Sequence, residues 1–445
     1  MPAEISIPKR RGKAKVKVST KRAMADAVLQ EVNSQGFDMD VAMIQGLIPL
    51  GLKAVEDRLQ REVVLLAGKR QAHGKENVRW GKQAGSVYLR DQKVPIMHPR
   101  VRNKAMDTEV PISGYEQMQE PYRGDRQTML RLLQGISTHK YSESMELVPE
   151  VFGISASNLS RRFKKNTLVQ LRALKNRSLK GYDFVCVIVD GKRYAEDGLL
   201  VALGITIDGV KVILDIDQSH SENSNVVRQL FDRLIERGIR FEEGILFIVD
   251  GAKGIIGAIK RQFEEYAFIQ RCQWHKQQNV TGYLNDSQKA ICKRQLQAAY
   301  AQTTYREAKA GLDKLYRELQ SVNESAANSL LEGLEETLTL HHLGLSPELC
   351  KSLNTTNCME SVMAQLGQYT DKVDRWHNSS QILRWTAAGL LEIEPRLHKI
   401  RGYRYLNLLR VKMREEIKRR QEKQALGSST IEDLGAGIHS TTQEI

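Results

Sequence analysis

The sequence predicts a mixed α/β core that is interrupted by an all-α insertion and preceded by a smaller helical region. The first observation is that short apolar, β-branched segments alternate with helical patterns between residues 182 and 284. The second is a polar, helix-favouring stretch without proline at 286–340. The third is a helix, a glycine turn and a basic helix between 125 and 165.

The core elements follow from their apolar patterns. Phe184–Val189 is apolar throughout and predicts a buried strand. Leu199–Ile207 and Val210–Ile216 follow, joined by an Asp-Gly turn, so the three segments predict an antiparallel meander. The next patterns predict a helix, a strand, a helix and a strand at 223–238, 244–249, 254–263 and 267–271. This order is that of a ribonuclease-H-like fold, an analogy that alone implies no function.

Composition shifts along the chain predict seven regions. They are a basic flexible arm at 1–35, a small helix and β-hairpin region at 36–122, a helix-turn-helix domain at 123–175, the first part of the ribonuclease-H-like core at 180–285, a helical insertion at 286–345, the end of this core at 346–400, and a basic helix with a disordered tail at 401–445.

Charge and cysteine content narrow the function class. The 445 residues carry a formal net charge of +14, which favours a polyanionic partner such as DNA. The 5 cysteines are few and odd in number, as expected in a reducing, cytoplasmic compartment. We find neither a signal peptide nor an apolar run long enough to cross a bilayer, so we expect a soluble protein that does not enter membranes.

Two aspartates stand in the same local context. Asp190 follows one predicted strand in a Val-Asp-Gly sequence, and Asp250 follows another in the same tripeptide. Strand ends in α/β sheets open onto the crevice where ligands bind. Two carboxylates there would suit hard divalent cations, although Asp-Gly is also an ordinary turn sequence.

Glu360 is a third candidate with a competing explanation. It lies three residues after Asn357, which fits a variant of the capping box at a helix N-terminus. On a helix, Glu360 would share a side with the small residues Ala364 and Gly367, leaving room for a bulky ligand. The two interpretations are compatible.

Cys272 and His275 have the spacing of half a zinc site, but no second Cys/His pair follows at a convincing distance. A structural role or a role near the substrate is the favoured alternative. A nucleophilic Cys-His pair is less favoured because nothing in the sequence would orient the histidine.

Basic residues cluster on two predicted helices. In the helix-turn-helix pattern, with a second helix at Tyr141–Phe152, Asn158 and Arg161 are candidates for reading bases, and the candidates for phosphate contact are Arg162, Lys164 and Lys165. Tyr405–Lys423 forms a basic helix that could also follow phosphates, or could simply be exposed to solvent.

Four ordered motifs resemble those of the Mutator-type transposases of bacterial insertion sequences. They are Val189-Asp190-Gly191, Val249-Asp250-Gly251-Ala-Lys-Gly254, Gln270-Arg-Cys272-Gln-Trp-His275-Lys-Gln-Gln-Asn279 and Asn354-Thr-Thr-Asn-Cys-Met-Glu360-Ser. The resemblance covers at least Asp183–Leu408 and is far more specific than any one motif.

The resemblance implies an Asp-Asp-Glu transposase on a ribonuclease-H-like core. Its catalytic and metal-binding residues would be Asp190, Asp250 and Glu360, with Asp190 bridging two Mg²⁺ or Mn²⁺ ions. The enzyme would hydrolyse a phosphodiester at the end of the element and direct the freed 3′-hydroxyl onto target DNA. The family's Cys-x-x-His motif falls on Cys272 and His275, whose role stays open. Double-stranded DNA with terminal inverted repeats would be the partner, and a homo-oligomer would bring two ends together.

Two other functions compete with this expectation. A DNA-binding regulator without catalytic activity would explain the charge and the helix-turn-helix pattern, but would leave both Val-Asp-Gly sequences without a role. A metal-dependent nuclease of the same fold would use the three carboxylates and never join strands.

Overall fold

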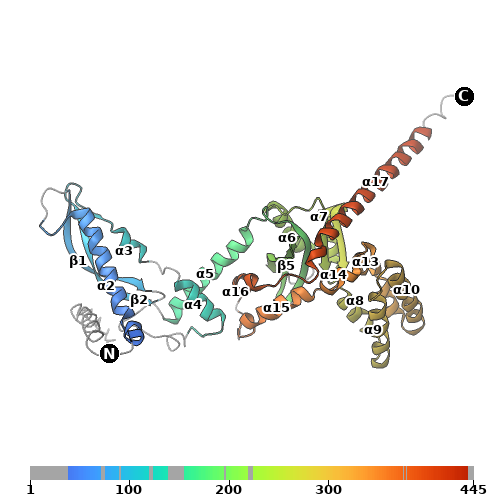
Figure 1. Ribbon diagram of the computed structural model, residues 1–445, viewed down its shortest axis with the longest axis horizontal. Helices are drawn as coiled ribbons and strands as arrows, with labels where there is room; N and C mark the ends of the chain where they lie inside the picture. The colour runs from blue at the N-terminus through green and yellow to red at the C-terminus, as the bar shows by residue number, and fades with distance from the viewer. Residues whose placement is uncertain are drawn as a thin grey trace, which may run out of the picture. The chain divides into compact units, whose positions relative to one another are not determined.

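The structure is a computed structural model of the chain, shown in Figure 1. It describes residues 39–71, 76–89, 92–119, 124–138, 155–194, 197–218, 224–373, 375–376 and 378–438. The chain divides into two compact units. The N-terminal unit comprises residues up to 132 together with 136–166, and the C-terminal unit comprises 133–135 and the rest of the chain from 167. The predicted arm at 1–35 lies outside the described residues.

A long helix packed on a β-hairpin forms the core of the N-terminal unit (Figure 1). The helix is α2 (Met39–Ala67), and the strands are β1 (Asn77–Leu89), β2 (Gln92–Asn103) and the short β3 (Thr108–Val110). They form one antiparallel sheet in the order β1-β2-β3. The buried side chains that join helix and sheet are Val55, Leu59, Val63, Val87, Ile96 and Val101. The predicted helix and hairpin are therefore both present.

Three further helices complete the described part of the N-terminal region: α3 (Ser113–Gln117), α4 (Gly124–Leu133) and α5 (Ala156–Asn176). The predicted third helix at 156–165 is the start of the longer α5. The predicted middle helix, Tyr141–Phe152, lies outside the described residues. The helix-turn-helix motif therefore stays a prediction.

A five-stranded mixed sheet forms the centre of the C-terminal unit, in the order β6-β5-β4-β7-β8. The strands are β4 (Phe184–Tyr194), β5 (Asp197–Thr206), β6 (Lys211–Gln218), β7 (Ile245–Val249) and β8 (Ala267–Arg271). The first three pair antiparallel as the predicted meander, while β7 and β8 run parallel to β4. Each predicted strand exists, and the largest error concerns β4, which continues five residues beyond the expected Val189.

Helices cover both faces of this sheet. One face packs against α6 (Ser224–Glu236) and α7 (Lys253–Phe263) through Phe231, Phe247 and Phe263, whose rings contact one another edge-on or tilted. Two further helices, α15 (Asn357–Thr370) and α17 (Leu406–Ile438), contact β4, and α16 (Ser379–Ile393) contacts β6. Burial on both faces explains why the strand sequences are continuously apolar rather than alternating.

The chain between β8 and α15 forms helices and no strands. They are α8 (Gln273–Thr281), α9 (Asp286–Tyr300), α10 (Tyr305–Val322), α11 (Glu324–Leu331), α12 (Leu334–Thr337), α13 (Thr339–His342) and α14 (Ser346–Leu353). Together, α8 to α12 enclose a separate apolar cluster that includes Leu296, Leu312 and Leu330. An all-α segment with its own core thus separates β8 from the helix that carries Glu360.

The basic C-terminal helix is more deeply integrated than its charge predicts. Arg410 of α17 is only 5% exposed, and it binds the Asp183 carboxylate and the carbonyls of Phe184 and Gly244. Arg420 donates to two backbone carbonyls beside edge strand β8 and lies over the Phe268 ring. These two arginines therefore hold the helix to the sheet, which corrects the idea that they follow phosphates. The helix also continues past Lys423 to Ile438, into the expected disordered tail.

Within the described residues, no helix is long and apolar enough to cross a membrane.

Candidate active site

Asp190 lies within strand β4, beyond the point where β4 pairs with β7. The last parallel pair is Ile188 with Ile248, whereas Asp190 itself is paired across the antiparallel ladder with Val201 of β5. The sequence had suggested that the strand ends at Asp190, but in the structure it continues to Tyr194. One carboxylate oxygen accepts a hydrogen bond of 2.9 Å from the Gly191 amide.

Asp250 follows strand β7 directly, and here the chain does turn. Gly251 has a φ of +107°, a conformation that side chains rarely adopt. The Asp250 carboxylate accepts a hydrogen bond of 3.0 Å from the Ala252 amide, which fixes the turn. Ile188 and Ile248 are neighbours on the parallel strands β4 and β7. The two aspartates, each two residues further along, therefore lie at the same end of this strand pair.

Glu360 lies in the first turn of α15, a helix that contacts β4. The helix begins after Thr356, and Asn357 is its first helical residue rather than its cap. No side-chain capping bond is present at this helix end, so the capping interpretation of Glu360 is wrong. Its side chain is exposed and has no hydrogen bond or ion pair to any described residue.

Electrostatics connect Asp190 with the other two carboxylates. Burial raises the pKa of Asp190 from 3.8 to about 6. The Gly191 amide and His275 oppose this shift, and the nearby charges of Asp250 and Glu360 add to it. Residues far apart in the sequence thus share one electrostatic environment, as expected of a functional site.

Cys272 and His275 lie at the start of α8, next to the carboxylates. Burial alone would raise the pKa of the Cys272 thiol, but hydrogen bonding with His275 and with the Thr356 amide lowers it overall. Hydrogen bonding with Cys272 raises the pKa of His275 against the effect of burial, and the charges of Asp190 and Asp250 raise it further. The thiol and the two aspartate charges therefore all favour the protonated imidazole.

The segment around these two residues connects the separate parts of the site. Arg271 is 4% exposed and donates to the carbonyl of Gly251, in the turn after Asp250, at 2.8 Å. The Cys272 sulfur accepts a hydrogen bond from the Thr356 amide at 3.5 Å, just before the Glu360 helix. The backbone amide of Gln273 donates to the backbone carbonyl of Asn354 at 2.9 Å. Three consecutive residues therefore position both the Asp250 turn and the start of α15.

Side chains of the same segment also bind the helical insertion, by donating hydrogen bonds to its backbone carbonyls. Gln270 and Gln273 each donate to the Thr337 carbonyl, at 2.8 and 2.9 Å. The buried Lys276 ammonium donates to the carbonyls of Ser329 and Glu332. Burial lowers the pKa of Lys276 to about 8, with Arg271 lowering it further against the opposing effect of the Glu332 and Glu336 charges.

The donor set of the site consists of hard oxygen ligands, which Mg²⁺ and Mn²⁺ prefer. Asp190, Asp250 and Glu360 supply carboxylates, and a dication among them would offset the charges of Asp250 and Glu360, which add to the effect of burial on the pKa of Asp190. Among the described residues, no three His, Cys, Asp or Glu side chains are already close enough to hold an ion together. The chemistry of the three residues therefore fits a divalent metal, but their carboxylates lie too far apart here to bind one ion together.

The candidate DNA-binding residues of α5 lie in the N-terminal unit and face different ways. Arg161, Lys164 and Lys165 are exposed, and Asn158 is half-buried. Arg162 is 8% exposed, donates to the Thr128 hydroxyl at 3.4 Å and lies over the Tyr88 ring. The other four remain candidates for DNA contact, whereas Arg162 packs inside its own unit.

Sequence reasoning did not single out Arg271, Gln273 or Lys276. Each is polar and almost fully buried, which a single sequence cannot show. Their only signal was their position inside the motif that contains Cys272 and His275.

Comparisons with known proteins place this site in a family. Residues 20–396 match the family described as "Transposase, Mutator family". The transposase for insertion sequence element ISRM5 of Rhizobium meliloti is 27% identical over 340 residues, which cover 74% of this chain and 82% of that protein. The transposase for IS905 of Lactococcus lactis is 22% identical over 75% of this chain and 85% of its own length. The transposase for IS256 in transposon Tn4001 of Staphylococcus aureus is 23% identical over 73% and 83%.

These relatives are all transposases of insertion sequences, and the match extends across both units of the chain. The chain belongs to the Mutator family of transposases.

Proposed function

We propose that this transposase cuts DNA at the ends of an insertion sequence and joins the ends to target DNA, using divalent metal ions held by Asp190, Asp250 and Glu360. The observation that carries the proposal is the placement of Asp190 and Asp250 on the neighbouring parallel strands β4 and β7. Burial raises the pKa of Asp190, and the charges of Asp250 and Glu360 add to this effect. A bound cation would offset these charges.

The sheet supports a ribonuclease-H-like core for this chemistry. Its order β6-β5-β4-β7-β8, with an antiparallel meander followed by two strands parallel to β4, is the arrangement that we expect of such a core. The two aspartates belong to the neighbouring central strands β4 and β7. We therefore extend the fold assignment from a mixed α/β sheet to the ribonuclease-H-like class.

Metal ions in this site would supply positive charge to the scissile phosphodiester and favour deprotonation of the attacking water or 3′-hydroxyl. The protein's own residues determine where that happens. Asp190 is fixed in the sheet and Asp250 in its turn, whereas the exposed and unpartnered Glu360 has the freedom to move toward them. We propose that Glu360 closes the site when metal and DNA bind.

Replacement of the aspartate in the centre of the sheet tests the proposal. We expect Asp190→Asn to lower cleavage of a duplex carrying the terminal inverted repeat by at least roughly 1,000-fold in Mg²⁺, with DNA binding unchanged. Asp286→Asn, on an exposed helix of the insertion, is the matched control. Cleavage by Asp190→Asn at a rate near that of the wild type would remove this residue from the active site.

A second measurement separates the transposase from the two competing functions. Incubation of a pre-cleaved end with target DNA should give joined products in Mg²⁺ or Mn²⁺. Cleavage without joining would indicate a nuclease, and binding without either reaction would indicate a regulator. Arg161→Ala should weaken binding to the terminal repeats more than binding to random DNA, because base contacts carry sequence preference.

A further inference from the structure

A hollow lined by amide groups opens beside the candidate active site. Its volume is about 480 Å³, and it lies between α8, the end of α9, α14 and the segment that leads to α15. Five amide side chains line it, from Gln273, Gln277, Gln297, Gln302 and Asn354. Among its described lining residues, Lys351 is the one with a full charge. The hollow therefore offers neutral donors and acceptors rather than an ionic site.

The Gln277 side chain leaves hydrogen-bonding capacity open in this hollow. It is 6% exposed as a whole residue, and its amide group has no hydrogen bond to any described residue. The amide atoms themselves stay in contact with solvent. The neighbouring Gln273, in contrast, donates to the Thr337 carbonyl and accepts from Asn354. Gln277 therefore offers a donor and an acceptor to a planar polar group that enters the hollow.

An exposed aromatic ring stands at the same place. Trp274 lines the hollow and is 45% exposed, although it lies in a well-packed unit. Its indole meets the His275 ring edge-on, with centroids 4.8 Å apart and an interplanar angle of 79°. At 45% exposure, the indole still has ring surface available for stacking. A tryptophan face beside free amide groups is the combination that binds a nucleobase.

Helix α8 connects the hollow to the carboxylates. Gln273, Trp274 and Gln277 line the hollow, whereas His275 interacts with the charges of Asp190 and Asp250. The hollow also borders Asn354 and Thr355, immediately before the helix of Glu360. A nucleotide whose phosphate is at the carboxylates thus has a cavity for a base next to it.

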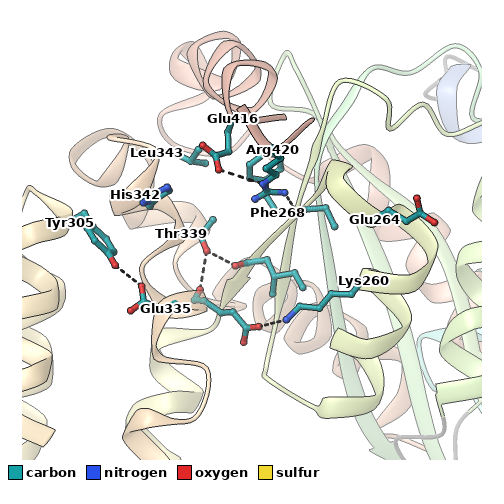
Figure 2. A pocket seen from close by; sticks show the side chains of 13 residues that line it. Lys260, Glu264, Phe268, Tyr305, Glu335, Thr339, His342, Leu343, Glu416 and Arg420 are labelled. Carbon is teal, nitrogen blue, oxygen red and sulfur yellow. Dashed lines mark hydrogen bonds and ion pairs between the residues drawn. The ribbon is translucent and has the colours of Figure 1, made fainter. Parts of the chain in front are cut away.

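A second hollow shows what an unsuitable cavity looks like. It has a volume of about 440 Å³ and lies between β8, the insertion and α17, as Figure 2 shows. Most of its polar side chains bond to one another: Tyr305 donates to Glu335, Lys260 pairs with Glu336, and Arg420 pairs with Glu416 (Figure 2). These paired groups leave little unmet bonding capacity, in contrast to Gln277.

We propose that the hollow around Trp274 and Gln277 holds one unstacked base of the DNA strand on which the enzyme acts. This inference rests on the proposed function, because the base must belong to the DNA bound at the carboxylates. Trp274 stacks on the base and Gln277 bonds its edge, which holds the adjacent phosphodiester in place. The base comes either from the end of the element or from target DNA.

A thermodynamic cycle between protein and DNA tests the proposal without requiring catalysis. The full chain is titrated, in the absence of divalent metal, with a duplex of the terminal inverted repeat and with a branched duplex that mimics the joined product. An abasic nucleotide is moved one position at a time along each strand. We expect Trp274→Ala to weaken binding of intact DNA by roughly 10-fold. This loss should disappear when the abasic nucleotide occupies the position whose base enters the hollow.

Gln277→Ala should show the same coupling at the same position, and its folding is checked by thermal unfolding. The matched controls are Tyr283→Ala, an exposed aromatic on the insertion, and Gln278→Ala, the neighbouring exposed amide, neither of which lines the hollow. Coupling in the repeat assigns the base to the element end, and coupling only in the branched arm assigns it to the target. Additive effects at every position would overturn the inference. That result would leave the proposed function standing, because Asp190→Asn tests it separately by cleavage.

Discussion

The two Val-Asp-Gly sequences are identical in letters and different in structure. At Asp190 the strand continues, and Gly191 pairs with Leu200 in the β4–β5 ladder. At Asp250 the strand ends, and Gly251 turns with a φ of +107°. A Cβ at Gly191 would meet only the Leu199 carbonyl at 3.7 Å, whereas at Gly251 it would lie 1.9 Å from Nε of Arg271. The partner strand, not the tripeptide, therefore determines the local backbone.

Exchange of each glycine for alanine gives the largest expected contrast. Gly251→Ala should lower the free energy of unfolding by roughly 2–4 kcal/mol, because it strains the backbone and displaces the Arg271 guanidinium. Gly191→Ala should leave stability unchanged or raise it by up to about 1 kcal/mol. Chemical denaturation of both variants measures the difference. Equal losses in the two would contradict the distinction between a strand and a turn.

Removal of the Arg271 guanidinium, which binds the Gly251 carbonyl in the turn after Asp250, should have the next largest effect on stability. Arg271→Met keeps the apolar length of the side chain but leaves the Gly251 carbonyl without its donor and removes one of the two donors to the Glu332 carbonyl. We expect a loss of roughly 2–3 kcal/mol in the free energy of unfolding. Arg261→Met, on the exposed side of α7, is the control and should change stability by less than about 0.5 kcal/mol. A similar result for both variants would show that the Arg271 contacts contribute little.

Burial of Asp190 should make the stability of the protein depend on pH. Its pKa in the folded protein is about 6, above the usual 3.8, so the folded state holds the proton more tightly than the unfolded state. Stability from this group is therefore present below about pH 4 and is lost as the pH rises to about 6. Asp190→Asn should be more stable than the wild type by roughly 1–2 kcal/mol at pH 7, and this advantage should shrink toward pH 4. Denaturation curves across this range provide the check, and a difference independent of pH would contradict it.

Glu360 should have the smallest effect on stability and one of the largest on activity. Its exposed carboxylate has no partner within the described chain, so Glu360→Gln should change the free energy of unfolding by less than about 0.5 kcal/mol. Cleavage of terminal-repeat DNA should nevertheless be lost if this carboxylate holds metal. A variant that is clearly less stable would reveal a structural role that the structure does not show.

The sequence was sufficient to predict most of the fold because the core strands are buried on both faces. Their apolar runs gave all five strands of the large sheet and the helices α6 and α7. The sequence was insufficient where pairing between distant segments decides the geometry. The extension of β4 depends on the ladder with β5, which no local pattern of Asp190-Gly191 encodes.

The candidate site was predictable only in part. The aspartates were recognisable from local sequence, but Glu360 depended on the family resemblance and the capping interpretation proved wrong. Arg162 was expected to contact phosphates and instead packs against Thr128 and Tyr88, because helical spacing alone does not show which side is covered. Gln277 gave no signal beyond its position in the motif of Cys272 and His275, since a buried glutamine has the same letter as an exposed one.

The way in which the insertion is attached has a consequence for sequence divergence. The receiving side chains on Gln270, Arg271, Gln273 and Lys276 bind its backbone carbonyls, at Thr337, Glu332 and Ser329. A carbonyl is the same whichever residue bears it. The insertion can therefore exchange most of its exposed side chains, and lengthen its remote loops, as long as its core stays apolar, while the four receiving residues must keep their identity. Relatives aligned across this region should vary freely on the exposed faces of the helices and hardly at all in the short motif that holds them.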